Sequence, residues 1–225
     1  MRNLSERLSL IASMVKSGSS VCDVGTDHGY LPAFLYLSGK CPNVCATDIR
    51  EKPLLNAQKN IEKLGATGVK LLLCDGLSAV TRNMADTVII AGMGGEVISG
   101  IMDRCAFLRD NTVELILQPM TAARELRCYL ASRGFAVEHE QAVAENGKIY
   151  TVMKVRFCGK PYSADERFLS IGLLQYETAE ARQYIDKQHR ICKAKLLDLE
   201  RGGIKGEDYE KTSQLLQKLE EIMRD

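Results

Sequence analysis

The chain has 225 residues, of which 45% are hydrophobic and 26% are charged, and its formal net charge is +1. This length fits one domain of roughly 150 residues with an appendage, or two small domains. The balanced charge excludes a protein that is strongly basic or acidic as a whole. No apolar run approaches the ~20 residues of a transmembrane helix, and the first segment lacks the apolar core of a signal peptide. We therefore expect a cytoplasmic protein with no membrane partner.

The eight cysteines do not have the spacing of a metal site. There is no Cys-x-x-Cys pair, and Cys41 and Cys45 lie four residues apart without a histidine nearby. We therefore expect no metal site. Reduced thiols in the core are expected for the six cysteines in or beside apolar segments: Cys22, Cys45, Cys74, Cys105, Cys128 and Cys192.

The apolar pattern predicts alternating helices and strands. Apolar residues at helical spacing from Leu4 predict an opening helix. Five short apolar strands follow, at 21–24, 43–47, 69–74, 87–91 and 114–118, the last one stopped by Pro119. Helices are expected between and after them, at 30–37, 53–64, 96–102 and 122–133. Continuous apolar strands separated by helices predict a parallel sheet covered on both faces.

The sheet is expected to end in an antiparallel hairpin. Segments 135–144 and 149–157 are joined around Asn146-Gly147, and Asn-Gly is a strong hairpin signal. The whole pattern predicts an α/β fold with a Rossmann-like class I methyltransferase sheet, mostly parallel with a C-terminal antiparallel hairpin. A hairpin that merely decorates the edge of an ordinary dinucleotide-binding sheet is the alternative.

Strand signals stop at 159–163, where we expect a domain boundary. A long helix is predicted over 165–201, Gly202-Gly203 ends it, and a second helix is predicted over 207–224. The second helix carries an apolar stripe formed by Thr212, Leu215, Leu216, Leu219, Ile222 and Met223. The sequence therefore predicts residues 1–158 as a catalytic domain and residues 159–225 as an α-helical, coiled-coil-like hairpin.

A glycine-containing loop follows the first strand. Its candidate ligand-binding residues are Asp23, Gly25, Thr26, Asp27, His28 and Gly29. The glycines let a ligand approach the backbone, next to the start of a helix. Asp27 stands where the dinucleotide fingerprint has a glycine, and its charge would repel a pyrophosphate. The loop favours a ligand with a cationic end, such as the ammonium and sulfonium of S-adenosylmethionine, over an ordinary strand–helix turn.

Two more acids follow the next two strands. Asp48, before Ile49, can accept hydrogen bonds from ribose hydroxyls, and Asp75, before Gly76, can accept one from the adenine amine. Either acid alone could be a helix cap or a turn residue. Because parallel strands end at one edge of the sheet, Asp27, Asp48 and Asp75 are expected to meet in one S-adenosylmethionine cleft.

The fourth and fifth strands lead into candidate substrate-binding residues. Ala91 and Gly92 are expected beside the cofactor, in a glycine-rich turn that suits close approach of a substrate. Gln118 offers an amide for a base edge. Both segments could be simple tight turns. We take the catalytic candidates to be Asp27, Gly92, Met93 and Gln118.

A basic stretch lies in the first helix of the expected C-terminal hairpin. Its candidate RNA-binding residues are Arg182, Lys187, Arg190 and Lys193. These side chains could track the phosphates of a polyanion, or they could form a solvated helix face.

Several motifs together are similar to those of the bacterial tRNA (adenine-22-N1)-methyltransferase family, often called TrmK. They are Leu4-Ser-Glu-Arg-Leu8, the segment 23–32, Ile90-Ala-Gly-Met-Gly-Gly95, Leu115-Ile-Leu-Gln-Pro119 and Asn146-Gly-Lys-Ile-Tyr150. The resemblance covers the whole chain, although the C-terminal part is generic in sequence. The acid at position 27, in place of the glycine of general methyltransferases, is also what this family shows.

The resemblance implies a function and a partner. It implies S-adenosylmethionine-dependent methylation of N1 of adenine 22 in tRNA, with the helical hairpin helping to hold the tRNA, in a monomer or weak dimer. Asp27 would then stabilise the developing charge of the base or hold the cofactor ammonium. Methylation of a small molecule or of another RNA base, nucleotide-dependent oxidoreduction and RNA binding without catalysis are the alternatives.

Overall fold

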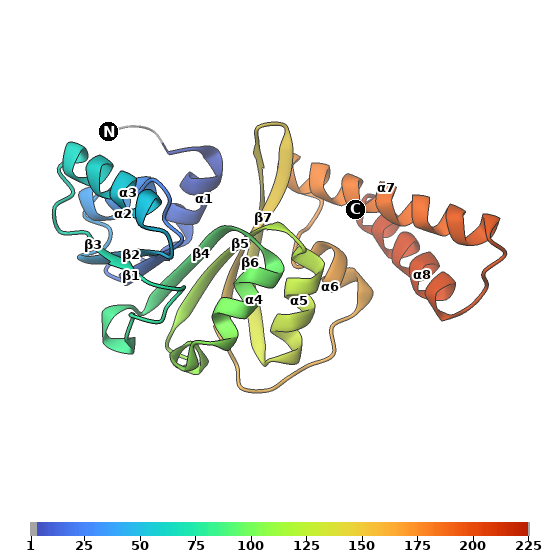
Figure 1. The fold of residues 1–225 in the computed structure, drawn as a ribbon. Helices are drawn as coiled ribbons and strands as arrows, with labels where there is room; N and C mark the ends of the chain where they lie inside the picture. Colours follow the sequence, from blue (N-terminus) through green and yellow to red (C-terminus); the bar gives the residue numbers. More distant parts are fainter. Residues whose placement is uncertain (1–3, 225) are drawn as a thin grey trace.

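The computed structural model describes residues 4–224 and contains one seven-stranded sheet with the order β3-β2-β1-β4-β5-β7-β6 (Figure 1). The strands are β1 (Ser20–Val24), β2 (Asn43–Asp48), β3 (Lys70–Leu73), β4 (Thr87–Gly94), β5 (Glu114–Thr121), β6 (Phe135–Glu145) and β7 (Lys148–Phe157). Strands β1 to β5 run parallel, whereas β7 pairs antiparallel with both β5 and β6. This arrangement confirms the predicted parallel sheet with a terminal antiparallel hairpin.

Helices cover both faces of the sheet, which explains why the strands are apolar throughout. They are α1 (Glu6–Met14), α2 (Tyr30–Leu37), α3 (Glu51–Leu64), α4 (Gly95–Asp103) and α5 (Ala123–Ser132). Ile89 of β4 packs in a cluster with α1, α2 and α3, while its neighbour Ile90 packs with α4 and α5. Successive strand residues point to opposite faces, so two covered faces require two sets of apolar side chains. In Figure 1, α4 and α5 lie next to each other on one face.

The fifth strand does not stop at Pro119, where the sequence predicts its end. Strand β5 continues to Thr121, and β4 continues beside it to Gly94. Pro119 lacks an N–H group, but it lies beyond the part of β5 that pairs with β7 and at a register shift opposite Met93. A proline is tolerated at such an irregular place because no ladder hydrogen bond is sacrificed there.

The prediction of one helix over 165–201 is wrong. The structure has a short α6 (Glu166–Ile171), a turn, and then α7 (Ala179–Arg201). Gly172 has a φ of +60°, and a Cβ atom there would collide with the carboxylate of Glu140. Helix α7 then begins after Thr178, whose hydroxyl caps it by accepting a hydrogen bond from the Ala181 N–H.

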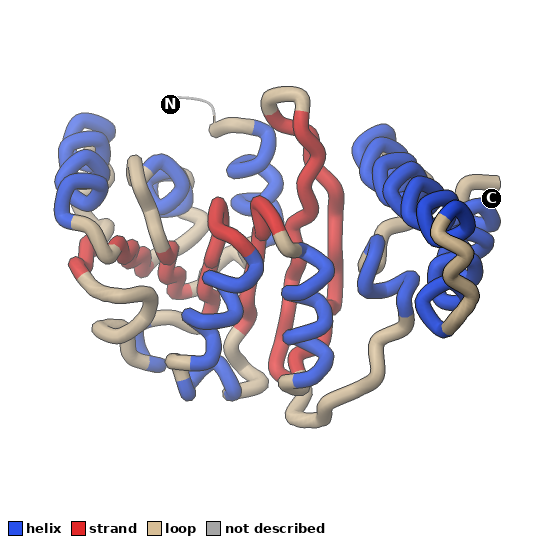
Figure 2. The backbone as a smooth tube through the Cα atoms, turned by 45° about the vertical axis from the view of Figure 1, so that its right-hand side comes forward, coloured by secondary structure: helices blue, strands red, loops and turns tan. Residues whose placement is uncertain are grey.

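The C-terminal helices form a hairpin with a small core of its own. Helix α7 packs against α8 (Glu207–Ile222), and Figure 2 shows this pair beyond the β6–β7 side of the sheet. The predicted stripe on α8 faces this core: Thr212, Leu215 and Leu219 are buried, and Leu216, Ile222 and Met223 pack against them. Contacts of α7 with β6 and β7 join the hairpin to the sheet.

The cysteines are free thiols, but not all of them lie in the core. Cys128 is exposed, contrary to expectation, because α5 buries the face that carries Leu126 and Leu130 instead. Cys74 is only half-buried. Within residues 4–224, no helix is both long and apolar enough to span a membrane.

Candidate active site at the carboxyl edge of the sheet

A cleft of about 350 Å³ opens where β1, β2 and β4 end. It brings together most of the predicted site residues: Gly25, Asp27, Asp48, Ile49, Asp75, Gly76, Ala91, Gly92 and Met93. A volume of this size is typical of small-molecule sites, and the carboxyl edge is where α/β sheets bind ligands. The structure thus places the three predicted acids around one cavity.

The loop after β1 is held tightly against the neighbouring strand. The N–H groups of Gly25 and Thr26 both donate to the Thr47 carbonyl, at 2.8 and 3.0 Å. Gly25 has a φ of +76°, and a Cβ atom there would lie 2.1 Å from Cε of Met93. The backbone angle favours glycine at this position, and any side chain there would also displace the flexible end of Met93.

Asp27 presents its carboxylate at the opening of the cleft. Its φ is +36°, one of the few positive values at a residue other than glycine, and its side chain is 61% exposed. His28 lies 3.4 Å from the Asp27 carboxylate and stacks on Tyr30, and it does not line the cavity. A non-glycine residue held in this backbone region is often found at functional sites.

Asp23 lies behind the loop and does not line the cleft. The residue is only 6% exposed, and this burial raises the pKa of its carboxyl to about 6. Because burial makes this carboxyl costly to ionise, a cationic ligand bound near the loop would favour its charged form and lower its pKa. Thr26 and Gly29 also support the loop without lining the cavity.

Asp48 and Asp75 differ in their surroundings. Asp48 is 5% exposed, and its Oδ1 accepts a hydrogen bond of 2.8 Å from the Arg50 N–H. Asp75 is half-exposed and pairs with Nη2 of Arg104 at 3.1 Å. Arg104 follows α4 and belongs to no motif, so no sequence signal points to it as a site residue. Because exposed ion pairs contribute about 0–1 kcal/mol, this pair can open for a ligand.

The structure places Gln118 differently from our expectation. Its side chain is fully buried, and its Oε1 accepts hydrogen bonds from the Gly92 N–H at 3.1 Å and from Nη1 of Arg7 at 2.7 Å. Its Nε2 donates to the Pro119 carbonyl at 2.8 Å. An amide that is fully engaged within the protein does not pair with a base, so Gln118 supports the Gly92 turn from behind. Arg7 was not identified from the sequence as a site residue, although it stands in the Leu4–Leu8 motif.

The four candidate RNA-binding side chains all lie exposed on α7. Lys187, Arg190 and Lys193 follow one another at intervals of three residues, which places them along one side of the helix. Arg182 is partly engaged, because its Nε donates to the Tyr176 carbonyl at 3.1 Å and its guanidinium lies over the Tyr176 ring.

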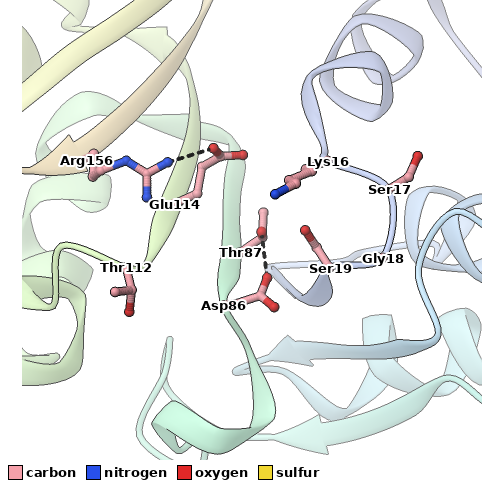
Figure 3. A pocket seen from close by; sticks show the side chains of 9 residues that line it. All are labelled: Lys16, Ser17, Gly18, Ser19, Asp86, Thr87, Thr112, Glu114 and Arg156. Carbon is pink, nitrogen blue, oxygen red and sulfur yellow. Dashed lines mark hydrogen bonds and ion pairs between the residues drawn. The ribbon is translucent and has the colours of Figure 1, made fainter.

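A second cleft, of about 320 Å³, lies at the opposite edge of the sheet, where β1, β4 and β5 begin (Figure 3). Two of its acids are engaged by groups of the protein itself. Oε2 of Glu114 accepts from Lys154 and Arg156 at 2.9 and 3.1 Å, and Asp86 accepts from the Ser20 N–H at 3.1 Å. Neither this cleft nor any other part of residues 4–224 has a cluster of three side chains that could hold a metal ion.

Comparisons with known proteins agree with a methyl-transfer site. The model of a family described as "Methyltransferase domain" matches residues 4–153. The chain is 33% identical over 172 residues to the tRNA (adenine(22)-N(1))-methyltransferase of Bacillus subtilis, which covers 76% of this chain and 72% of that protein.

Two solved structures are similar over nearly their whole length. One is a putative tRNA (m1A22) methyltransferase of Streptococcus pneumoniae in complex with S-adenosyl-L-methionine, with a TM-score of 0.80 and 28% identity, covering 98% of this chain and 100% of that one. The other is the Bacillus subtilis m1A22 tRNA methyltransferase TrmK, with a TM-score of 0.81 and 25% identity, covering 99% of this chain and 100% of that one.

Proposed function

The chain belongs to the family of tRNA (adenine(22)-N(1))-methyltransferases, and from this premise we propose how its own residues carry out the reaction. It is an S-adenosylmethionine-dependent enzyme that methylates N1 of an adenine in tRNA. The observation that carries this proposal is the meeting of Asp27, Asp48 and Asp75 at one cleft beside the Gly92 turn.

The residues of the cleft fit the chemistry of S-adenosylmethionine. When bound, this cofactor supplies a methyl group on a positively charged sulfonium. Asp48 would accept the ribose hydroxyls, and Asp75 would accept the adenine amine once its pair with Arg104 opens. Asp27 and the backbone of Gly25 would hold the amino-acid end, because an acid favours an ammonium group there. Val97, which is 54% exposed at the cleft, adds apolar surface.

Asp27 has a second role in this proposal. N1 of adenine attacks with its own lone pair, so no base has to remove a proton first. The methylated base becomes cationic, and a carboxylate next to it stabilises the charge that grows in the transition state. The exposed Asp27 carboxylate stands at the mouth of the cleft, where it can face both the cofactor and the base.

The Gly92 turn would form the surface that the base approaches. Gly92 is exposed and has a φ of +77°, and Met93 lies beside it in the cleft. N1 is on the Watson–Crick edge, so the adenine must be unpaired or flipped to reach this surface. Met93, Tyr30 and Tyr150 are our candidates for apolar contact with the base.

We further propose that residues 159–225 hold the tRNA while residues 1–158 carry out the chemistry. The separate core of α7 and α8 and the family match to residues 4–153 support this division. The exposed cations of α7 would contact phosphates and read shape more than sequence. Because tRNA is the substrate, we propose that the enzyme acts in the cytoplasm, as a monomer or weak dimer.

The test is methylation of unmodified tRNA in the presence of labelled S-adenosylmethionine, followed by nucleoside analysis. We expect 1-methyladenine with a tRNA that has adenine at position 22, and none when position 22 is guanine. Asp27→Ala should lose this activity and keep its thermal unfolding transition. Label in any other nucleoside, or full turnover by Asp27→Ala, would contradict the proposal.

A further inference from the structure

Arg7 connects two parts of the chain that are far apart in sequence. From α1 its Nε donates to Oε2 of Glu145 at 2.9 Å, and its Nη1 donates to Oε1 of Gln118 at 2.7 Å. The side chains of Arg7 and Glu145 are only 17% and 16% exposed. Hydrogen bonds between ionised groups are stronger than neutral ones, and partial burial protects them from solvent.

Gln118 extends this chain of hydrogen bonds to the active-site turn. The same Oε1 that accepts from Arg7 also accepts from the Gly92 N–H, at 3.1 Å. If the Gln118 amide were turned over, its NH₂ group would face Arg7 and the Gly92 N–H, which can only donate hydrogen bonds. The two contacts therefore fix the orientation of the amide. A Cβ atom on Gly92 would lie 3.7 Å from Nη1 of Arg7, which places the guanidinium directly against the turn.

Glu145 links the same chain to the β6–β7 hairpin. Burial alone would raise the pKa of the Glu145 carboxyl, but hydrogen bonds from Ser5 and Arg7 and the charge of Arg7 hold the pKa below its ordinary value. The carboxylate therefore stays ionised at neutral pH. Glu145 is the last residue of β6, beside the turn of the hairpin.

The hairpin touches both the catalytic and the helical parts of the protein. Val143 and Tyr150, on one face, pack in the core cluster that includes α1. Ala142 and Ile149, on the other face, pack against the core of the C-terminal helices. Figure 1 shows the hairpin rising between α1 and α7, and both helices contact β6.

We propose that Arg7 is a positioning residue for methyl transfer, which fixes the Gly92 turn through Gln118 and anchors it through Glu145 to the hairpin beneath the RNA-holding helices. This inference rests on the proposed function, because it assumes that the base approaches Gly92. Displacing a reacting group by about 1 Å can cost about 100-fold in rate. Gly92 also lines the cofactor cleft, but the acids assigned to the cofactor do not contact Arg7, so cofactor affinity should depend on Arg7 much less than the rate does.

The experiment compares Arg7→Met with wild type in single-turnover methyl transfer at saturating tRNA. We expect the rate to fall by about 100-fold. The dissociation constant of S-adenosylmethionine, measured by calorimetry, should stay within about threefold of the wild-type value. A tenfold change, which corresponds to ~1.4 kcal/mol of binding free energy, would be clearly larger. Arg7→Lys keeps the charge but loses the planar guanidinium that reaches both Glu145 and Gln118. Its rate should therefore lie between the rates of wild type and Arg7→Met. Arg82→Met is the matched control: Arg82 also pairs with an acid, Asp110, but it lies away from the cleft, and its replacement should leave the rate unchanged.

A double-mutant cycle separates positioning from a general loss of stability. If Arg7 acts through Gln118, the variant with both Arg7→Met and Gln118→Met should be about as slow as the slower single variant. Three results would overturn the inference. The first is that the rate losses of Arg7→Met and Gln118→Met multiply in the double variant, and the second is an unchanged rate in Arg7→Met. The third is a loss of cofactor affinity in Arg7→Met and Arg7→Lys that parallels the loss of rate. Inactive wild-type protein would instead overturn the proposed function, so the two failures can be told apart.

Discussion

The sheet and the C-terminal helical hairpin are held together by different means. The sheet has two dense cores and tight loops that favour glycine, as at Gly25, where φ is +76°. The helical hairpin has one small core, and most of its ion pairs, such as Lys195–Asp208, are exposed. The segment that leads from the sheet to this hairpin is anchored on a fully buried pair of the sheet part, Arg127 of α5 and Glu140 of β6, at 2.6 Å. The sheet part thus combines dense cores with tight loops, whereas the helical part depends on amphipathic packing, with one charged anchor where it joins the sheet.

The largest effect should come from breaking this anchor. Arg127 also donates to the carbonyl groups of Leu169 and Ser170, and Glu140 accepts from the Leu173 N–H, so the pair holds the start of the helical part. Glu140→Gln leaves a buried charge without its partner and should reduce the free energy of unfolding by about 3–5 kcal/mol. Denaturant unfolding would measure it.

An exposed ion pair provides the control for the anchor. Glu207→Gln removes the partner of Lys211 on the surface of α8, and it should leave the denaturant midpoint nearly unchanged because solvent screens such an exposed pair. Equal losses in the two variants would show that the buried pair is not a special link between the two parts.

The next effect tests the steric constraint at the cofactor loop. Gly25→Ala combines an unfavourable φ with a Cβ that displaces the end of the Met93 side chain at the cleft, and we expect cofactor affinity to fall by roughly 10- to 30-fold, from about 1–2 kcal/mol of left-handed strain. Gly39→Ala is the control, because Gly39 has a φ of +68° but open space around it. It should lower stability slightly and bind S-adenosylmethionine normally. Similar affinity in both variants would mean that the loop is not the binding surface.

A smaller effect concerns pH. The pKa of Asp23 in the free protein is raised to about 6, so its carboxyl is neutral below that pH and offers no charge to a cationic cofactor. We expect affinity for S-adenosylmethionine to be constant above pH 6 and to fall by up to about tenfold per unit below it. The stability of the free protein should change in the opposite sense, because a raised pKa favours folding at low pH and the benefit disappears as pH rises through 6. Asp23→Asn should abolish both slopes in calorimetry and thermal unfolding, and slopes that persist in this variant would assign them to another group.

The smallest effect should be seen on α7. Replacing Lys187, Arg190 and Lys193 with glutamine should weaken tRNA binding and flatten its dependence on salt, with the slope falling by about 0.7–0.9 for each phosphate that these cations neutralise. Lys211→Gln, on α8, is the control. An unchanged salt slope in the triple variant would remove this side of α7 from the tRNA interface.

The sequence predicted the sheet and the meeting of Asp27, Asp48 and Asp75 at one cleft, because both follow from local patterns. Apolar strands, the Asn146-Gly147 turn and the acids after successive strands each have one common structural meaning. What it did not predict depends on contacts between distant residues. The end of α6 at Gly172 is set by Glu140 on β6, the burial of Gln118 by Arg7, and the pairing of Asp75 by Arg104. Nothing within each segment indicates these partners.

The central claim, that the acids at the carboxyl edge of the sheet hold the cofactor, is tested most directly by a crystal structure with S-adenosylhomocysteine. We predict that the ligand lies in the cleft between Gly25 and Gly92, with its ribose hydroxyls on Asp48 and its adenine next to Asp75. A ligand bound elsewhere, for example in the cleft at the opposite edge that contains Glu114, would contradict the assignment. So would a ligand in the predicted cleft that makes no hydrogen bond to Asp27, Asp48 or Asp75.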